Sequence, residues 1–233
     1  MTEVAQAESL ILERVSKLST RTIPLGDAVG AVLREDVCAE RDHPPFDRVT
    51  MDGIAIAYRD WQAKENIYQV VGTQAAGAPP MKITQPCQCI EIMTGAVLPV
   101  GTDTVVPIER VRRRNSEAQI SADTPVSARQ FIHPRGSDRL AGTHLIRSGT
   151  RIGPAETAIL TSAGYSQVIV SRLPRVAVIS TGDELVGVDE PIKPYQIRSS
   201  NDRAIEASLI RHQLAQPTRT RLKDERAKML RSV

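Results

Sequence analysis

Four short stretches of the sequence place a carboxylate or a hydroxyl group beside glycine, at points where the chain is expected to turn. They are Asp52-Gly53, Thr94-Gly95, Gly136-Ser137-Asp138 and Thr181-Gly182-Asp183-Glu184. Oxygen atoms on a turn can face a ligand, which suits charge neutralisation and the positioning of a substrate. For the first three stretches ordinary turn chemistry is the simpler interpretation, because Asp and Thr beside Gly are what turns are commonly made of.

The fourth stretch follows the apolar run RVAVIS, residues 175–180. Such a run predicts a strand buried on both faces of a parallel sheet, and ligands bind beyond the carboxyl ends of such strands. Ser180 and Thr181 would offer hydroxyl groups there, and Gly182 would let a ligand approach the backbone. The two following carboxylates could hold magnesium, which would offset the charge of a phosphate-bearing substrate. The alternative is a helix N-terminus capped by Thr181, where the helix dipole favours acids.

Cysteine and histidine add no second site. Three cysteines, Cys38, Cys87 and Cys89, support neither a zinc site nor a disulfide framework, so thiols in a reducing compartment are expected. The four histidines lack metal-ligand spacing. We recognise no secretory signal and no apolar run of about 20 residues, and therefore expect a cytoplasmic protein without a membrane partner.

The overall composition is that of an ordinary globular protein, with 233 residues of which 41% are hydrophobic. A net charge of +3 is too small to predict a nucleic-acid partner. The one basic cluster, Arg112 to Arg114, is expected to be the solvated end of a strand, with an anion site as the alternative.

The hydrophobic periodicity changes twice along the chain. Residues 2–18 carry apolar residues three and four positions apart, which predicts one amphipathic helix. Residues 46–140 alternate short β-branched runs with turns and predict a β-rich module. A helix is expected from Pro154 to Gly164. After Leu173 the pattern becomes α/β, with one strand and then a helix that Asn201 caps. The sequence thus predicts a multi-domain chain of α/β and β class.

Four motifs that occur in a fixed order point to one protein family. "PPFDRVTMDGIAIA", "EIMTGAVLPVGTDTVVPIE", "RGSDRLAG" and "RVAVISTGDEL" occur in this order. Together they resemble the molybdopterin molybdotransferase family, which includes the MoeA proteins and the gephyrin E domain, and the resemblance covers nearly the whole chain.

The resemblance implies an elongated homodimer. Residues 1–43 and 141–172 would form a mixed α/β dimerisation domain, residues 44–140 an inserted β-rich domain, and residues 173–233 an incomplete α/β molybdopterin-binding domain. The rest of that domain and the family's C-terminal barrel would be absent after Val233. The active-site cleft would lie between the β-rich domain of one subunit and the molybdopterin-binding domain of the other.

The resemblance also implies an activity, the insertion of molybdate into adenylylated molybdopterin with magnesium and release of AMP. The upstream adenylyltransferase would be a partner. By position, the catalytic candidates are Asp52, Thr94, Asp138 and Glu184, and the residues expected to bind the molybdopterin substrate are Ser180, Thr181, Gly182 and Asp183. The expected magnesium ligands are Asp52, Asp138 and Glu184.

Three departures from the family pattern lie near these motifs. Val49 stands where the family usually has Ser, Ile54 replaces Tyr, and Glu91 stands where Arg is common. A lost hydroxyl and a reversed charge would both weaken anion handling. The alternative to an enzyme is therefore a truncated or non-catalytic scaffold relative, like the gephyrin E domain, which keeps mainly the dimerisation and β-rich domains.

Overall fold

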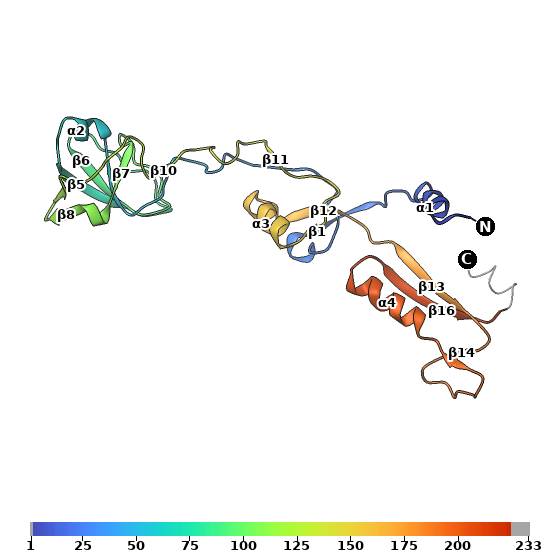
Figure 1. Cartoon of the computed structure of the whole chain (residues 1–233). Coiled ribbons are helices and arrows are strands. Elements are labelled where there is room, and N and C mark those ends of the chain that lie inside the picture. The colour runs from blue at the N-terminus through green and yellow to red at the C-terminus, as the bar shows by residue number, and fades with distance from the viewer. Residues whose placement is uncertain (1, 225–233) are drawn as a thin grey trace. The chain divides into compact units, whose positions relative to one another are not determined.

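The computed structural model describes residues 2–224. The chain divides into two compact units, one of which is Cys38–His144 and the other the two flanking segments, Met1–Val37 and Leu145–Val233 (Figure 1). We call the first the inserted unit and the second the flanking unit. The boundaries predicted for the β-rich insert, residues 44 and 140, fall inside the inserted unit. The division of the flanking unit into two domains stays a prediction.

The inserted unit is built on a six-stranded sheet in the order β7-β4-β6-β5-β9-β8. Neighbouring strands are antiparallel, except that β5 and β6 are parallel. The strands are β4 (Gly53–Ile56), β5 (Ile67–Gln74), β6 (Gln88–Ile92), β7 (Thr104–Pro107), β8 (Val111–Arg114) and β9 (Glu117–Ile120). They coincide with the β-branched runs of the sequence, which confirms the prediction of strands there. The short helix α2 (Tyr58–Gln62) was not predicted.

Strand β4 is buried along its whole length. Ile54 and Ile56 pack with Tyr68 on one side of the sheet, while Ala55 packs with Val49 on the other. This alternation is what a period of two residues produces in a strand with apolar surroundings on both faces. A strand anchored on both faces holds the turn that precedes it in a defined place.

Two further features of the inserted unit bear on the site. A two-residue antiparallel pair joins β3 (Arg48–Val49) to β10 (Ile132–His133). Strand β8 forms one edge of the sheet, and the arginines along it are exposed, which confirms the prediction of a solvated strand. A 3-10 turn, η2 (Ile108–Arg110), connects β7 to β8.

The first part of the flanking unit pairs β1 (Thr20–Pro24) antiparallel with β12 (Gln167–Ser171). Helix α3 (Pro154–Ser162) packs with this pair through the buried Leu160. Pro154 opens the helix, the Glu156 carboxylate accepts a hydrogen bond from the Gly153 backbone N–H at 2.9 Å, and Gly164 follows the helix at φ +82°. The predicted helix is thereby confirmed. The remaining short elements are η1 (Leu25–Asp27), β2 (Val37–Cys38) and β11 (His144–Ile146).

The N-terminal helix is shorter than predicted. Helix α1 spans Val4–Leu12, and none of its residues is buried. Val15 and Leu18, which were expected on the same apolar face, follow the helix and are exposed. A short helix gains most of its stability from packing its apolar face, and the described residues offer α1 no such surface.

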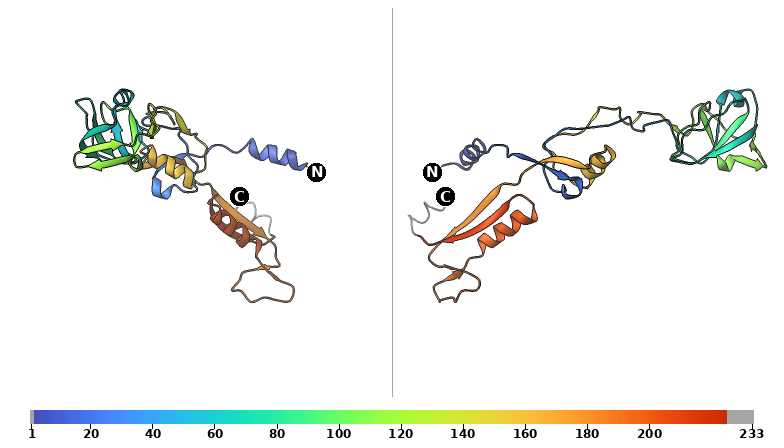
Figure 2. Two further views of the ribbon diagram at one scale, coloured as in Figure 1. Left: turned by 60° about the vertical axis from the view of Figure 1, so that its left-hand side comes forward. Right: turned by 180° about the vertical axis from the view of Figure 1, so that it is seen from behind.

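The second part of the flanking unit is a β-α-β arrangement. Strands β13 (Arg175–Thr181) and β16 (Gln216–Leu222) are parallel, and helix α4 (Asn201–Arg211) lies against one face of the pair (Figures 1 and 2). A second short parallel pair joins β14 (Leu185–Val186) to β15 (Ile197–Arg198).

Two predictions about this part were wrong. Only Val178 of β13 is buried, so the strand is not covered on both faces; within the described residues α4 covers one face. Asn201 is the first residue of α4 and not its cap, because Ser200 takes the N-cap position and makes no capping hydrogen bond through its side chain. The sequence therefore predicted the strand β13 and the helix α4 correctly, but not the burial of the strand or the capping residue of the helix.

We predict that Ile54→Ala destabilises the inserted unit by about 2 to 5 kcal/mol, because removing a fully buried side chain leaves a cavity. Ile67→Ala, at the 47% exposed start of β5, is the matched control and should cost much less. Trp61 is the chain's one tryptophan and packs against the same core as Ile54, so its fluorescence in a urea titration follows this unit. Equal losses for the two variants would contradict the assignment of the core.

Candidate functional site

Asp52 lies in the turn between β3 and β4, and Thr94 lies in the turn after β6. The turns meet because β4 runs antiparallel to β6, which places Gly53 opposite Ile92. Asp52 Oδ1 accepts two hydrogen bonds from Thr94, one from the backbone N–H at 2.6 Å and one from the hydroxyl Oγ1 at 2.7 Å. The backbone and then the hydroxyl donor favour the ionised form and hold the pKa of Asp52 below its ordinary value.

The backbone of this acid is held from the other side of β4. The Ile108 backbone N–H donates to the carbonyl oxygen of Asp52 at 3.0 Å. A Cβ atom built on Gly53 would lie 1.9 Å from the Val106 carbonyl oxygen, so only glycine lets β7 approach this closely. Within the described part of the chain, Asp52 Oδ2 accepts no hydrogen bond. One carboxylate oxygen is thus fixed by two donors, and the other has no hydrogen-bond donor among the described residues.

Asp138 lies in the loop after β10, in the same unit. The loop turns at Gly136, whose φ is +72°, and the Asp138 backbone N–H donates to the His43 carbonyl oxygen at 2.9 Å. The Asp138 side chain is 56% exposed, and its Oδ1 lies 2.9 Å from Nε2 of His133. This second predicted acid therefore also has one oxygen held by a neighbour.

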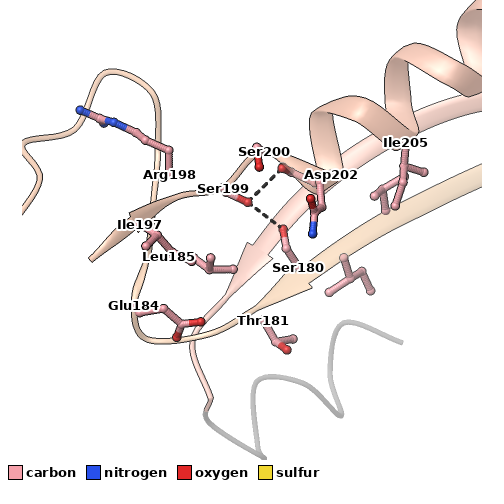
Figure 3. Close-up of a pocket in the computed structure, with 13 residues that line it drawn as sticks. Ser180, Thr181, Glu184, Leu185, Ile197, Arg198, Ser199, Ser200, Asp202 and Ile205 are labelled. Carbon is pink, nitrogen blue, oxygen red and sulfur yellow. Dashed lines mark hydrogen bonds between the residues drawn. The ribbon is translucent and has the colours of Figure 1, made fainter. Parts of the chain in front are cut away.

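A pocket of about 410 Å³ lies between the carboxyl end of β13 and the first turn of α4 (Figure 3). Of the residues predicted at this end of the strand, Ser180, Thr181 and Glu184 line the pocket, whereas Gly182 and Asp183 do not. The chain turns after Thr181 and enters β14, so the alternative of a helix capped by Thr181 is wrong.

Sequence reasoning missed the opposite wall of this pocket. Ser199 Oγ donates to Asp202 Oδ1 at 2.9 Å and lies 3.4 Å from Ser180 Oγ (Figure 3). Although burial opposes the ionisation of Asp202, hydrogen bonds from Ser199 and Arg219 hold its pKa below the ordinary value. The Ser-x-x-Asp spacing at the start of α4 resembles a capping box and could have drawn attention to this pair.

The carboxylates are of the right kind for magnesium, because hard cations prefer oxygen ligands. No group of three or more His, Cys, Asp or Glu side chains among residues 2–224 could hold a metal ion, however. Asp52 and Asp138 belong to the inserted unit and Glu184 to the flanking unit. The predicted ligand set is therefore not built within either unit alone.

Two of the departures from the family pattern, Val49 and Glu91, have clear local surroundings. Val49 is fully buried and packs in the core, so its side chain offers nothing to a ligand. The Glu91 carboxylate pairs with Nε of Arg113 at 2.7 Å and accepts a hydrogen bond from Thr73 Oγ1 at 2.8 Å. The negative charge at this position is balanced by its own arginine, and the expected weakening of anion handling at Glu91 stays a prediction.

The three cysteines are free thiols. Burial raises the pKa of Cys89 to about 12, which keeps this thiol protonated and unreactive at neutral pH. Among the described helices, none has the length and apolar character needed to cross a membrane.

Comparison with known proteins places this geometry in a family. The sequence profile of the MoeA N-terminal region (domain I and II) matches residues 2–164. The chain is 34% identical over 231 residues to the molybdopterin molybdenumtransferase of a Synechocystis species, which covers 99% of this chain and 59% of that protein. It is 38% identical over 225 residues to the protein of the same name from a Nostoc species, which covers 93% of this chain and 51% of the relative.

A solved structure shows the same fold. The molybdopterin biosynthesis MoeA protein from Pyrococcus horikoshii superposes with a TM-score of 0.85 at 28% identity, over 98% of this chain and 62% of that one. This chain spans between half and about three-fifths of the length of these proteins. Because the profile matches well over half of the chain and the relatives match nearly all of it, the chain belongs to the MoeA family, through the N-terminal region that comprises domains I and II.

Proposed function

We propose that this chain takes part in molybdenum cofactor biosynthesis, as a transferase that inserts molybdate into adenylylated molybdopterin and releases AMP. Relatives named molybdopterin molybdenumtransferase match nearly its whole length. The structural observation that carries the proposal is the carboxylate of Asp52, which Thr94 holds on a turn with one oxygen left for a ligand.

The roles of the polar residues follow from their contacts. Thr94 orients Asp52 through its backbone N–H and its hydroxyl. Asp138 and Glu184 would supply further carboxylate oxygens toward the substrate and a magnesium ion. Bound magnesium would offset the negative charge of the phosphate groups and of molybdate. None of these side chains is proposed to become covalently bound to the substrate, so the chain contributes positioning and charge.

The pocket of the flanking unit is proposed to hold part of the molybdopterin substrate. Its volume falls within the usual range for small-molecule sites, about 300 to 1,000 Å³. The hydroxyl groups of Ser180, Thr181 and Ser199 can donate to phosphate or pterin oxygens. Gly182 and Asp183 lie on the turn beside the pocket, where they would contact a ligand larger than the pocket itself.

The placement of the acids in separate units suits a cleft shared between two subunits. We propose that the chain forms a homodimer in the cytoplasm, in which the inserted unit of one copy meets the flanking unit of the other. The adenylyltransferase that makes the substrate would be its upstream partner. A non-catalytic scaffold is the second candidate function, and it would have no use for the Asp52 and Thr94 geometry.

The assay for this function uses a hybrid, in which the C-terminal region of the Synechocystis relative continues the chain after Leu222. In this hybrid Asp52→Asn should lower AMP release about 100-fold, because a displaced or neutralised positioning group is worth that much in a preorganised site. Asp123→Asn, an exposed acid of the same unit, is the matched control. The Trp61 unfolding midpoint of Asp123→Asn should equal that of the parent, and that of Asp52→Asn should stay close to it, because an amide oxygen can still accept both hydrogen bonds from Thr94. If Asp52→Asn keeps nearly the parent's activity, Asp52 has only a structural role in the turn.

Thr94→Val should raise the pKa of Asp52 toward its ordinary value, since the hydroxyl donor is lost and the backbone donor remains. The folded-state pKa of Asp52 lies below the unfolded value of about 3.9. The carboxylate therefore contributes stability above that pH and loses it as the pH falls through the folded-state pKa. The carboxyl ¹³C titration of Asp52 measures the change. Thr73→Val, which removes a hydroxyl that donates to Glu91, should leave the curve unmoved.

The dimer is predicted to form through residues 1–43 and 141–172. Light scattering at micromolar concentration should then give twice the chain mass of 25.5 kDa. Ile11→Glu on the exposed helix α1 should shift the protein toward monomer, because a charge on a packed apolar face is costly. Val188→Glu, an exposed apolar position outside those segments, should leave the dimer intact. A parent chain that is monomeric in this measurement would contradict the prediction.

A further inference from the structure

The short pair of β3 and β10 carries two kinds of residue on its two faces. Val49 and Ile132 are directly opposite each other and pack in the core. Arg48 and His133, the next opposed pair, therefore share the outer face. Nη2 of Arg48 lies 3.2 Å from Nδ1 of His133, and Nε2 of His133 lies 2.9 Å from Oδ1 of Asp138. The three side chains form one continuous line of contacts.

These contacts favour one tautomer of a neutral His133 ring. A guanidinium group has only donors, so Nδ1 of His133 must accept the hydrogen bond from Arg48. A neutral ring that accepts at Nδ1 carries its hydrogen on Nε2. Nε2 then donates to the Asp138 carboxylate, which accepts. Arg48 thus selects the tautomer that can hold Asp138.

We infer that His133, kept in its Nε2–H form by Arg48, is the positioning residue for the Asp138 carboxylate, a role that rests on the proposed function of Asp138. The Asp138 side chain is 56% exposed, and an exposed side chain without a partner samples several rotamers. The hydrogen bond from His133 engages Oδ1, and within the described residues Oδ2 accepts none. A neutral donor holds the acid without cancelling its charge, as Thr94 does for Asp52.

The experiment uses the isotope-labelled 233-residue chain. Nuclear magnetic resonance at about pH 8, where histidine is ordinarily neutral, reports which ring nitrogen of each histidine carries the hydrogen. The chain has four histidines, so His133→Gln identifies the signals of His133 by their absence. We expect the Nε2–H form alone in the parent. Arg48→Ala should let the Nδ1–H form appear, while Arg112→Ala, another exposed arginine of the inserted unit, should change nothing. A parent ring with its hydrogen on Nδ1 would overturn the inference, and the variants His133→Gln and Arg48→Ala are first checked for the parent's Trp61 unfolding midpoint.

The positioning itself is read from the three-bond couplings that report χ1 of Asp138. A single rotamer is expected in the parent and in His133→Gln, whose side-chain amide replaces the Nε2 donor. His133→Asn, whose amide replaces Nδ1 instead, should give averaged couplings. Averaged couplings in the parent, or equal couplings in the two variants, would overturn the inference.

The two proposals fail separately. If the hybrid releases no AMP and Asp138 has a single rotamer, the proposed function is rejected and the contact between His133 and Asp138 is supported. An active hybrid together with a freely rotating Asp138 in the chain would reject only this inference.

Discussion

The close approach of β7 to β4 at Gly53 is the constraint on which the inserted unit depends. A side chain at this position would overlap the Val106 carbonyl oxygen, so glycine alone lets β4 pair with β7 on one side and β6 on the other. The pairing with β6 brings the turn that contains Thr94 to the turn that contains Asp52. The acid is thus placed by backbone pairing within a buried sheet, which is far stiffer than the turn on which it sits.

The carboxylates of the inserted unit differ in the groups that hold them. Some pair with arginine, as Asp42 does with Arg135 and Glu91 with Arg113, and others accept from a backbone N–H, as Asp103 does from Tyr58 at 2.6 Å. The predicted site acids are instead held by partners that need not be charged, a threonine for Asp52 and a histidine for Asp138. An arginine cancels a carboxylate's charge, whereas a neutral donor fixes its direction and preserves it. Asp52 and Asp138 are thus each held through one oxygen without a paired arginine, and their role toward a cation or substrate stays a proposal.

The flanking unit builds its pocket by another route. The hydroxyl groups of Ser180 and Ser199 meet because the carboxyl end of β13 faces the first turn of α4. Asp202 and Arg219 then tie α4 to β16, with 3.1 Å between the carboxylate and the guanidinium. The pocket is therefore polar at its base and rests on a pair of strands that has one covered face within the described residues. The position of these hydroxyl groups follows from the β-α-β connection and not from a glycine contact.

Local pattern was sufficient to predict most of the elements. The β-branched runs placed the strands of the large sheet, and Pro154, Glu156 and Gly164 placed α3, because strand alternation and helix capping act over a few residues. Four motifs in register were enough to identify the family. The same local rules failed where burial decides the outcome. The apolar run of β13 predicted a strand covered on both faces, which the structure does not show. The apolar pattern of residues 2–18 predicted a longer helix than α1, which ends at Leu12.

Only the tertiary structure decided the partners of the site residues. Asp52 was recognisable as an acid beside glycine, but its donor Thr94 lies 42 positions away and reaches it through the register of β4 and β6. The contact between Arg48 and His133 spans 85 positions and depends on the register of β3 and β10. The sequence by itself determined which residues carry oxygen and nitrogen groups and which segments turn. Strand register determined which of these groups meet, because it is set by the packing of whole faces and not by neighbours along the chain.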